Sequence, residues 1–335
     1  MWHLIKRSLT PLVVGLTLLF VAVEVGIDLF APTVKQGRFN YGYDHEAGLE
    51  IEGEQAALVR SAGRRYRPQA FPLHPVGMRL AVVGDSVPRG NSLESSYAKQ
   101  LERLLQQRGV AAHGVNAGVA GQGSRRLQPI VAQMLRINSG WIIYHLNDSN
   151  EFEDEREWKR AQQFQGWSPG NWLMKSFIIR RLYEAKTEQL YWKWLSPNLR
   201  AANMVSDADA EVRAAADKET VARWHQRLAK VTTETVERTV QAGAQMVLVV
   251  QAISRTGPDG GLQLEKIAHL EQLAQNLSLQ QGGRVLSLSM YDLFAGQDLP
   301  ALFKDGTHLT NLGHTMLAEA LAPHVTHHTA VAARY

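Results

Sequence analysis

A chain of 335 residues has room for one large domain or two smaller ones, and its 45% hydrophobic and 20% charged residues indicate a folded protein. The formal net charge is only +4, with basic residues dispersed among nearly as many acids. This argues against a nucleic-acid partner, which would need a concentrated basic face. The absence of cysteine excludes disulfides, thiolate catalysis and Cys-ligated zinc.

The first thirty residues carry the pattern of a membrane anchor. Lys6 and Arg7 precede an apolar run from Leu9 to Phe30, and about 20 apolar residues suffice to cross a bilayer as a helix. A cleaved signal peptide is the competing interpretation, but the best cleavage position, Ala31, is followed by proline. The positive-inside rule keeps the two basic residues in the cytoplasm. We therefore expect residues 9–31 to contact membrane lipid and the rest of the chain to lie outside the cytoplasm, in the periplasm of a bacterium.

Glu24 lies within this apolar run, where an acid is costly unless it faces a partner or water. Its position near the end of the run allows the side chain to reach the lipid headgroups. A membrane partner protein that binds the helix is the alternative. The polar residues that follow have no clear period and predict a membrane-proximal connector that includes at most a short strand.

From Met78 onward the hydrophobic pattern becomes regular. Short apolar strand candidates occupy residues 78–84, 113–118, 141–146, 246–251 and 284–289. Amphipathic segments of helix length occupy residues 97–108, 124–138, 220–242 and 264–280, and a last helix is expected at about 311–321. Alternation of helices with strands that are apolar on both faces predicts an α/β domain. The expected fold is a flavodoxin-like, doubly wound, five-stranded parallel sheet.

One interval, at about 150–218, is too long for an ordinary connection. It holds five of the eight tryptophans, Trp158, Trp167, Trp172, Trp192 and Trp194. Aromatic residues at helical spacing predict a helical insertion that caps the site, lies on the bilayer, docks a partner or simply packs against the main domain. The predicted organisation is a cytoplasmic stub (1–8), an anchor (9–31), a connector (32–76), an α/β domain with this Trp-rich insertion (77–325) and a tail (326–335).

Four short stretches with reactive or polar side chains lie at or beside the ends of predicted strands. They are Gly84-Asp85-Ser86, "NAGVAGQGS" with Gly118, Gly121 and Gly123, "HLND" with Asn147 and Asp148, and "DGTH" from Asp305 to His308. In a parallel sheet the carboxyl ends of the strands share one edge, where open α/β sheets bind their ligands. We therefore expect the four stretches to converge.

The residue types in these stretches match the requirements of acyl transfer. A serine hydroxyl such as that of Ser86 is a poor nucleophile unless a base takes its proton, and His308 supplies an imidazole for that role. Asp305, on the same short loop, can accept the other imidazole N–H. An oxyanion hole needs two or three donors aimed at one point, and the Ser86 N–H, the Gly121 N–H and the Asn147 side-chain amide are the candidates.

Taken in this order, the four stretches resemble the conserved blocks of the SGNH hydrolases, also called the GDSL lipase and esterase family. That name refers to the serine, glycine, asparagine and histidine of four blocks. The matching residues are Ser86, Gly121, Asn147 and His308, with Asp305 as the acid. The resemblance implies a serine ester hydrolase that forms an acyl-enzyme on Ser86, with no cofactor.

The resemblance covers about Met78 to His324 and includes two departures from the family pattern. The third block usually opens with glycine, but here it opens with His145, and Val87 follows the serine where leucine is frequent. His145 is expected to narrow the pocket or to hydrogen-bond a substrate, and Asp148 is a second candidate substrate-binding residue. A metal site built from Asp85, His145, Asp148 and His308 matches no standard metal motif, so no metal is predicted.

The substrate follows from the resemblance and the predicted topology together. Family members held at a membrane often act on cell-surface or exported polysaccharides, from which they remove O-acetyl groups or to which they add them. We therefore expect an O-acetyl (acyl) esterase or acetyltransferase whose ester substrate is an acylated glycan. The alternatives are a lysophospholipase or thioesterase-type lipid hydrolase, and a non-catalytic scaffold that binds a glycan or a membrane acyltransferase.

Overall fold

The computed structural model describes residues 2–30, 49–58, 69–119, 121–151, 154, 176, 178–179, 218–254 and 260–332. The chain divides into two compact units. The first unit consists of Met1–Ala47, Arg60–Tyr66 and Glu157–Ala215, and the second unit of Gly48–Val59, Arg67–Arg156 and Ala216–Tyr335. All predicted site residues belong to the second unit.

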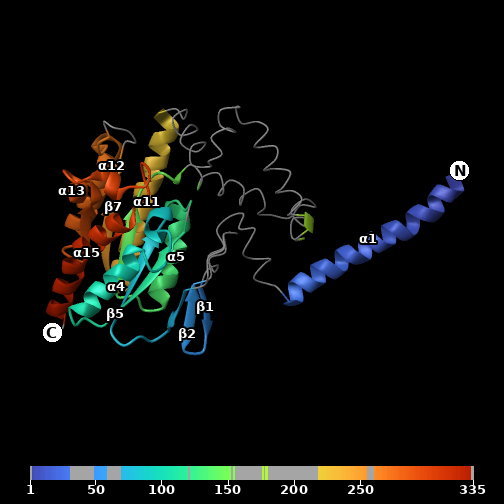
Figure 1. The fold of residues 1–335 in the computed structure, drawn as a ribbon, viewed down its shortest axis with the longest axis horizontal. Coiled ribbons are helices and arrows are strands. Elements are labelled where there is room, and N and C mark those ends of the chain that lie inside the picture. The colour runs from blue at the N-terminus through green and yellow to red at the C-terminus, as the bar shows by residue number, and fades with distance from the viewer. Residues whose placement is uncertain are drawn as a thin grey trace. The chain divides into compact units, whose positions relative to one another are not determined.

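The second unit is built on a five-stranded sheet (Figure 1). Its strands are β4 (Met78–Gly84), β5 (Ala112–Gly118), β6 (Trp141–Leu146), β7 (Gln245–Val250) and β8 (Val285–Ser289). The spatial order is β5-β4-β6-β7-β8, and every neighbouring pair is parallel. Numbered along the chain this is the order 2-1-3-4-5 of flavodoxin-like sheets. The predicted parallel sheet is confirmed, and its order reverses between β4 and β6.

Helices cover both faces of this sheet. One face packs against α5 (Ser124–Arg136), α11 (Lys218–Gln241) and α12 (Leu264–Gln280), and the other against α4 (Tyr97–Gln107) and α15 (Asn311–Ala332). Alternate residues of β4 serve the two cores: Ala81 and Val83 join the first, Leu80 and Val82 the second. The described residues around this sheet also form three short helices that the sequence analysis did not predict: α3 (Ser86–Arg89), α13 (Met290–Phe294) and α14 (Leu299–Leu302).

The predicted connector contains more regular structure than the sequence pattern indicated. Three short strands, β1 (Leu49–Glu52), β2 (Gln55–Leu58) and β3 (Gln69–Pro72), form an antiparallel sheet. Gln69 joins it to β5: its Oε1 accepts from the Asn116 N–H and its Nε2 donates to the Gly114 carbonyl, both at 3.0 Å. Because β5 is an edge strand, this side chain occupies backbone groups that would otherwise be open to another chain.

In the first unit, α1 (Trp2–Phe30) contains the predicted anchor. Several of its apolar side chains are exposed, among them Leu12, Leu16 and Leu19. Among the described residues, however, no helix is long and apolar enough to cross a membrane, so the structure does not support the predicted transmembrane span. Glu24 is satisfied within its own unit, because its Oε1 accepts from the Ser176 hydroxyl and the Ile178 N–H, each at 2.7 Å. Most of the predicted Trp-rich insertion lies outside the described residues.

Candidate active site

The turn after β4 is fixed by the Asp85 carboxylate. Asp85 is buried and caps α3, with Oδ1 accepting from the Val87 N–H at 2.9 Å and Oδ2 accepting from the Asn150 side-chain amide at 2.8 Å. Burial raises the pKa of Asp85, and the hydrogen bonds from Val87 and Asn150 offset part of that rise. Asp85 therefore positions the first residue of α3, which is Ser86.

Gly84 is required by the close approach of its neighbours. A Cβ at this position would lie 2.6 Å from the His145 Cβ and 2.6 Å from the Pro88 Cγ. No side chain fits there without moving β6 or α3. The glycine of the Gly-Asp-Ser stretch thus lets β4 end directly against its neighbour, and this brings the Ser86 turn to the point where the sheet order reverses.

Ser86, His308 and Asp305 form one continuous hydrogen-bonded chain. His308 Nε2 lies 2.9 Å from Ser86 Oγ, and His308 Nδ1 lies 2.8 Å from Asp305 Oδ2. The other oxygen of Asp305 accepts from the backbone N–H groups of Thr307 and His308, at 2.8 and 2.7 Å. Ser86 is half-buried, whereas the side chains of His308 and Asp305 are 41% and 53% exposed, which leaves them accessible to a ligand.

The electrostatics of Asp305 suit a group that holds an imidazole. Partial burial raises its pKa, but the hydrogen bonds from His308 and from the Thr307 N–H lower the pKa further, so that the net pKa lies below its ordinary value. An ionised Asp305 accepts the Nδ1 proton of His308. Nε2 then carries the lone pair that can accept the Ser86 hydroxyl proton.

Asn147 presents a buried donor that has no partner. It directly follows β6, and its Oδ1 accepts from both the N–H and the hydroxyl of Ser149, at 3.0 and 2.8 Å. A weak side-chain hydrogen bond from Asn147 lowers the pKa of Asp85, but the buried Asn147 Nδ2 has no described partner at normal hydrogen-bond distance. Because a buried unpaired donor costs free energy, its presence needs an explanation, and an oxyanion ligand provides one.

The second block reaches the first through a backbone bond, in which the Val119 N–H donates to the Gly84 carbonyl at 2.8 Å. Gly121 has a φ of +73°, a conformation that favours glycine, and its carbonyl accepts from the Arg126 guanidinium. Arg126 is itself held by Asp154 at 2.9 Å. The structure thus fixes the carbonyl side of Gly121, and the role of its N–H stays a prediction.

The structure does not place His145 where it could touch a substrate. Its side chain is fully buried, with Nδ1 3.4 Å from the Tyr97 hydroxyl and Nε2 3.2 Å from the Gln251 side-chain oxygen. Burial lowers its pKa to about 3, so the ring is neutral. This placement disfavours the predicted substrate contact, because every residue of β6 is buried and no side chain on either face of the strand reaches solvent. Asp148, the other candidate, lies instead beside two histidines.

Asn116 is a positioning residue that the sequence analysis did not predict. Asn116 is fully buried in β5, and its Nδ2 donates to the carbonyls of Pro88 and Arg89, at 3.0 and 3.1 Å. Its Oδ1 accepts from the Gly118 N–H at 3.0 Å. These bonds hold the turn after Ser86 against β5. A polar residue in an otherwise apolar strand was the available signal.

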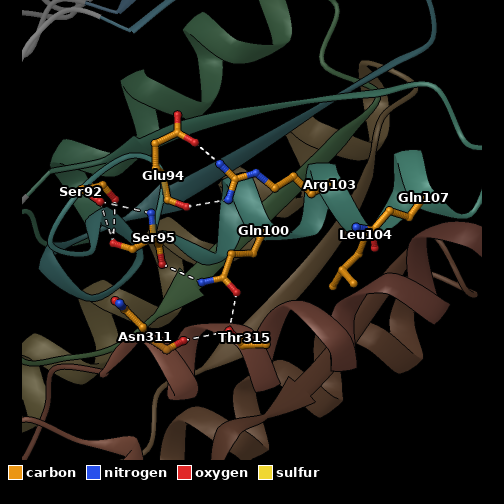
Figure 2. A pocket seen from close by; sticks show the side chains of 9 residues that line it. All are labelled: Ser92, Glu94, Ser95, Gln100, Arg103, Leu104, Gln107, Asn311 and Thr315. Atoms are coloured by element: carbon orange, nitrogen blue, oxygen red, sulfur yellow. Dashed lines mark hydrogen bonds and ion pairs between the residues drawn. The ribbon is translucent and has the colours of Figure 1, made fainter.

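A surface hollow of about 450 Å³ lies apart from these groups (Figure 2). Its lining residues are Ser92, Glu94, Ser95, Gln100, Arg103, Leu104, Gln107, Asn311 and Thr315. Figure 2 shows that several of its polar groups bond to one another, such as Ser92 with Ser95 at 2.8 Å and Thr315 with Gln100 at 2.6 Å. None of the predicted site residues lines it, and we assign it no function.

Solved structures similar to this chain include GDSL-type lipolytic proteins and esterases. An acetylxylan esterase variant from Geobacillus stearothermophilus is 12% identical, with a TM-score of 0.43 and coverage of 75% of this chain and 96% of that one. A lipolytic protein of the G-D-S-L family from Veillonella parvula is 9% identical, with a TM-score of 0.41 and coverage of 73% and 96%. A psychrotrophic esterase from Pseudoalteromonas is 10% identical, with a TM-score of 0.42 and coverage of 74% and 96%.

No protein-family model matches the chain, and no curated protein sequence does. The identities to solved structures are low, and sequence similarity at this level does not carry an activity from one protein to another. The case for an activity therefore rests on the hydrogen-bonded chain at the sheet edge and on the unpaired amide beside it.

Proposed function

We propose that this chain is a serine ester hydrolase of the SGNH type, with Ser86 as the nucleophile. The observation that carries the proposal is the unbroken path from Asp305 through His308 to Ser86 Oγ, with separations of 2.8 and 2.9 Å. A nucleophile within hydrogen-bond distance of a base, which is itself oriented by a third group, is the arrangement that acyl transfer requires.

The geometry gives each group of the triad one task. His308 Nε2 accepts the Ser86 hydroxyl proton while Oγ forms a bond to the ester carbonyl carbon. The carbonyl π electrons move to oxygen, and when they return the alcohol leaves with the proton that His308 donates. Water or another hydroxyl then attacks the acyl-serine by the same steps in reverse. Asp305 holds the imidazole in one tautomer and stabilises its charged form.

The negative oxygen formed in these steps needs donors that are already in place. Asn147 Nδ2 is such a donor, because its amide is oriented by Ser149 and its N–H groups have no partner among the described residues. The Ser86 N–H belongs to the first turn of α3, where a helix provides no acceptor of its own. The Gly121 N–H is the third proposed donor.

The test is labelling of the full chain with a fluorophosphonate probe, combined with hydrolysis of p-nitrophenyl acetate. Ser86→Ala should lose both labelling and turnover, because it removes only the attacking oxygen. Ser92→Ala is the matched control, since Ser92 is an exposed serine that the site does not use. Persistent labelling of the Ser86→Ala variant would overturn the proposal, and so would a folded wild-type protein that neither labels nor turns over.

For the substrate, we propose an O-acetyl or other short acyl ester of a polysaccharide, on the strength of the family resemblance. The buried position of His145 removes the argument that its bulk shortens the pocket. The acyl length is therefore tested directly with p-nitrophenyl esters from acetate to octanoate. We expect rates to fall along that series; a preference for octanoate would favour the lipid hydrolase instead. A sugar acceptor that increases alcohol release would indicate transfer rather than hydrolysis.

We also propose that the chain is held at a membrane through residues 9–30, with the second unit outside the cytoplasm. Lys6 and Arg7 support this orientation, and the exposed apolar side chains of α1 support contact with lipid. The protein should stay with membranes after a carbonate wash, and a periplasm-specific reporter fused after Tyr335 should be active. A soluble form that begins after Ala31 would overturn this location.

A further inference from the structure

Three side chains from three separate elements of the second unit meet beside the proposed active site. Asp148 lies in the loop after β6, His225 on α11 and His269 on α12. Asp148 Oδ2 lies 3.3 Å from His225 Nε2 and 3.4 Å from His269 Nε2. One ligand atom from each residue lies within 4.8 Å of the others. We call these three residues the Asp148 cluster.

The two contacts of Asp148 with the histidines are longer than well-formed charge-assisted hydrogen bonds. A charge-assisted bond between an imidazole nitrogen and a carboxylate measures about 2.7–2.9 Å, shorter than either separation here. His269 Nε2 is buried and makes no hydrogen bond with any described residue, although it lies 3.4 Å from the Asp148 carboxylate. The two rings also stack, with centroids 3.9 Å apart and planes 21° apart.

The two separations from Asp148 Oδ2 do match those across a metal centre, and the two imidazole nitrogens lie within 4.8 Å of each other. Bonds of about 2.0–2.1 Å to imidazole nitrogen and about 2.0–2.2 Å to carboxylate oxygen, at tetrahedral angles, place neighbouring ligand atoms about 3.3–3.5 Å apart. A cation between the three atoms would also provide a partner for His269 Nε2, which makes no hydrogen bond with the described residues. We propose that the Asp148 cluster binds one Zn²⁺ ion through Asp148 Oδ2, His225 Nε2 and His269 Nε2.

The three side chains are 18%, 35% and 30% exposed for Asp148, His225 and His269, so an ion can reach them from solvent. Two imidazoles and one carboxylate favour Zn²⁺ among the divalent ions that hold no redox role, and they leave a fourth position for water. The ion would join α11 and α12 to the loop that carries Asn147. This site goes beyond the proposed esterase activity, and no step of that reaction passes through it.

The test uses the full chain, stripped of metal with a chelator and titrated with ZnCl₂ by calorimetry. We expect one Zn²⁺ per chain in the wild type and at least a 100-fold weaker affinity in the double variant His225→Gln with His269→Gln. His74→Gln is the matched control, because it also removes a histidine but an exposed one. It should bind Zn²⁺ as the wild type does. Zn²⁺ should raise the thermal unfolding midpoint of the wild type and of the control, but not that of the double variant.

The coordination geometry and the folding of the double variant are measured separately. Co²⁺ in place of Zn²⁺ should give the visible absorption of a tetrahedral centre with nitrogen and oxygen ligands in the wild type. Circular dichroism and Ser86 labelling show whether the double variant is folded; if it is not, Asp148→Asn takes its place. Absence of stoichiometric Zn²⁺ binding in the wild type would overturn the proposal, as would equal binding by a folded variant. Tighter binding of Fe²⁺ with octahedral spectra would overturn the choice of metal.

Discussion

Two clusters that each bring an aspartate and a histidine together lie near the carboxyl ends of the strands, and they differ in the spacing of their polar atoms. In the first, which we call the catalytic cluster, His308 joins Asp305 and Ser86 at 2.8 and 2.9 Å. In the Asp148 cluster, the carboxylate and the two imidazoles are 3.3 and 3.4 Å apart. Separations of 2.8 and 2.9 Å are those of hydrogen bonds, whereas separations of 3.3 and 3.4 Å fit two ligand atoms of one metal ion.

The two clusters also differ in how they are assembled. Asp305 and His308 share one short loop, and backbone N–H groups of that loop fix the Asp305 carboxylate. The Asp148 cluster instead depends on two long helices meeting a loop at the correct rotation. A local cluster of acid and base thus tolerates movement of the surrounding helices, and a distributed cluster does not. The distance between the carboxylate oxygen and the imidazole nitrogen, more than the residue types, therefore determines which chemistry an aspartate and a histidine can perform.

Substituting a histidine should reduce activity far more in the catalytic cluster than in the Asp148 cluster. His308→Ala should lower kcat for p-nitrophenyl acetate by about 10⁴-fold or more, because the base that takes the serine proton is gone. His269→Gln should cost far less, since its ring touches no reacting atom in the proposed mechanism. Stopped assays with matched protein concentrations and fluorophosphonate labelling would measure both. Equal losses in the two variants would contradict the separation of roles.

The catalytic cluster could be predicted from the sequence for a physical reason. Parallel strands end at a common edge, so residues that directly follow strands converge wherever the hydrophobic pattern locates those strands correctly. The pattern located β4 and β6 at their observed bounds, and Ser86 and Asn147 follow them closely. Asp305 and His308 needed no long-range information, because only two residues of one loop separate them.

A smaller loss of activity is expected from substitution of Asn147, which directly precedes Asp148 in the chain. Asn147→Ala should lower kcat by roughly 10²–10³-fold, because it removes one hydrogen bond made to the oxyanion but not to the resting ester. Ser149→Ala is the matched control. It removes only one of the two bonds to Asn147 Oδ1, so the amide stays oriented by the Ser149 N–H.

Steady-state kinetics on the same ester series measures both variants. The expected signature for Asn147→Ala is a fall in kcat with little change in KM, because the lost bond forms in the transition state. A loss of similar size in Ser149→Ala, or a change in KM alone, would show that Asn147 orients the loop instead of stabilising the oxyanion.

Other features were beyond the reach of the sequence pattern. His225 and His269 lie on amphipathic helices that alternate with different strands, and no local spacing indicates that their rings stack. The pattern indicated an apolar strand at β6 but not that His145 would be enclosed, because burial on both faces depends on the helices that pack there. The strands β1–β3 are too short and too polar to show a period. In each case the missing information was tertiary.

The smallest expected change concerns the pH dependence of stability and arises from His145 and His314, histidines that contact neither Ser86 nor the proposed metal. Burial lowers the pKa of His145 to about 3; burial, followed by the charge of Lys304, lowers the pKa of His314 to about 4. Both values lie below the unfolded value of about 6.5, so the unfolded chain binds protons more tightly. The stabilisation is complete above about pH 6.5 and is lost as the pH falls toward these folded values. Each histidine should lower the free energy of unfolding by up to about 1.4 kcal/mol per pH unit.

Urea unfolding at pH 7, 6 and 5, followed by tryptophan fluorescence with a chelator present, measures this slope free of any metal contribution. His145→Gln should reduce the slope by about one histidine's share, whatever its effect on stability at pH 7, because glutamine does not titrate. His74→Gln, which removes an exposed histidine, is measured beside it as the comparison variant. An unchanged slope in His145→Gln would show that this ring takes up its proton in the folded protein. The interpretation of His145 as a neutral, purely structural side chain would then be wrong.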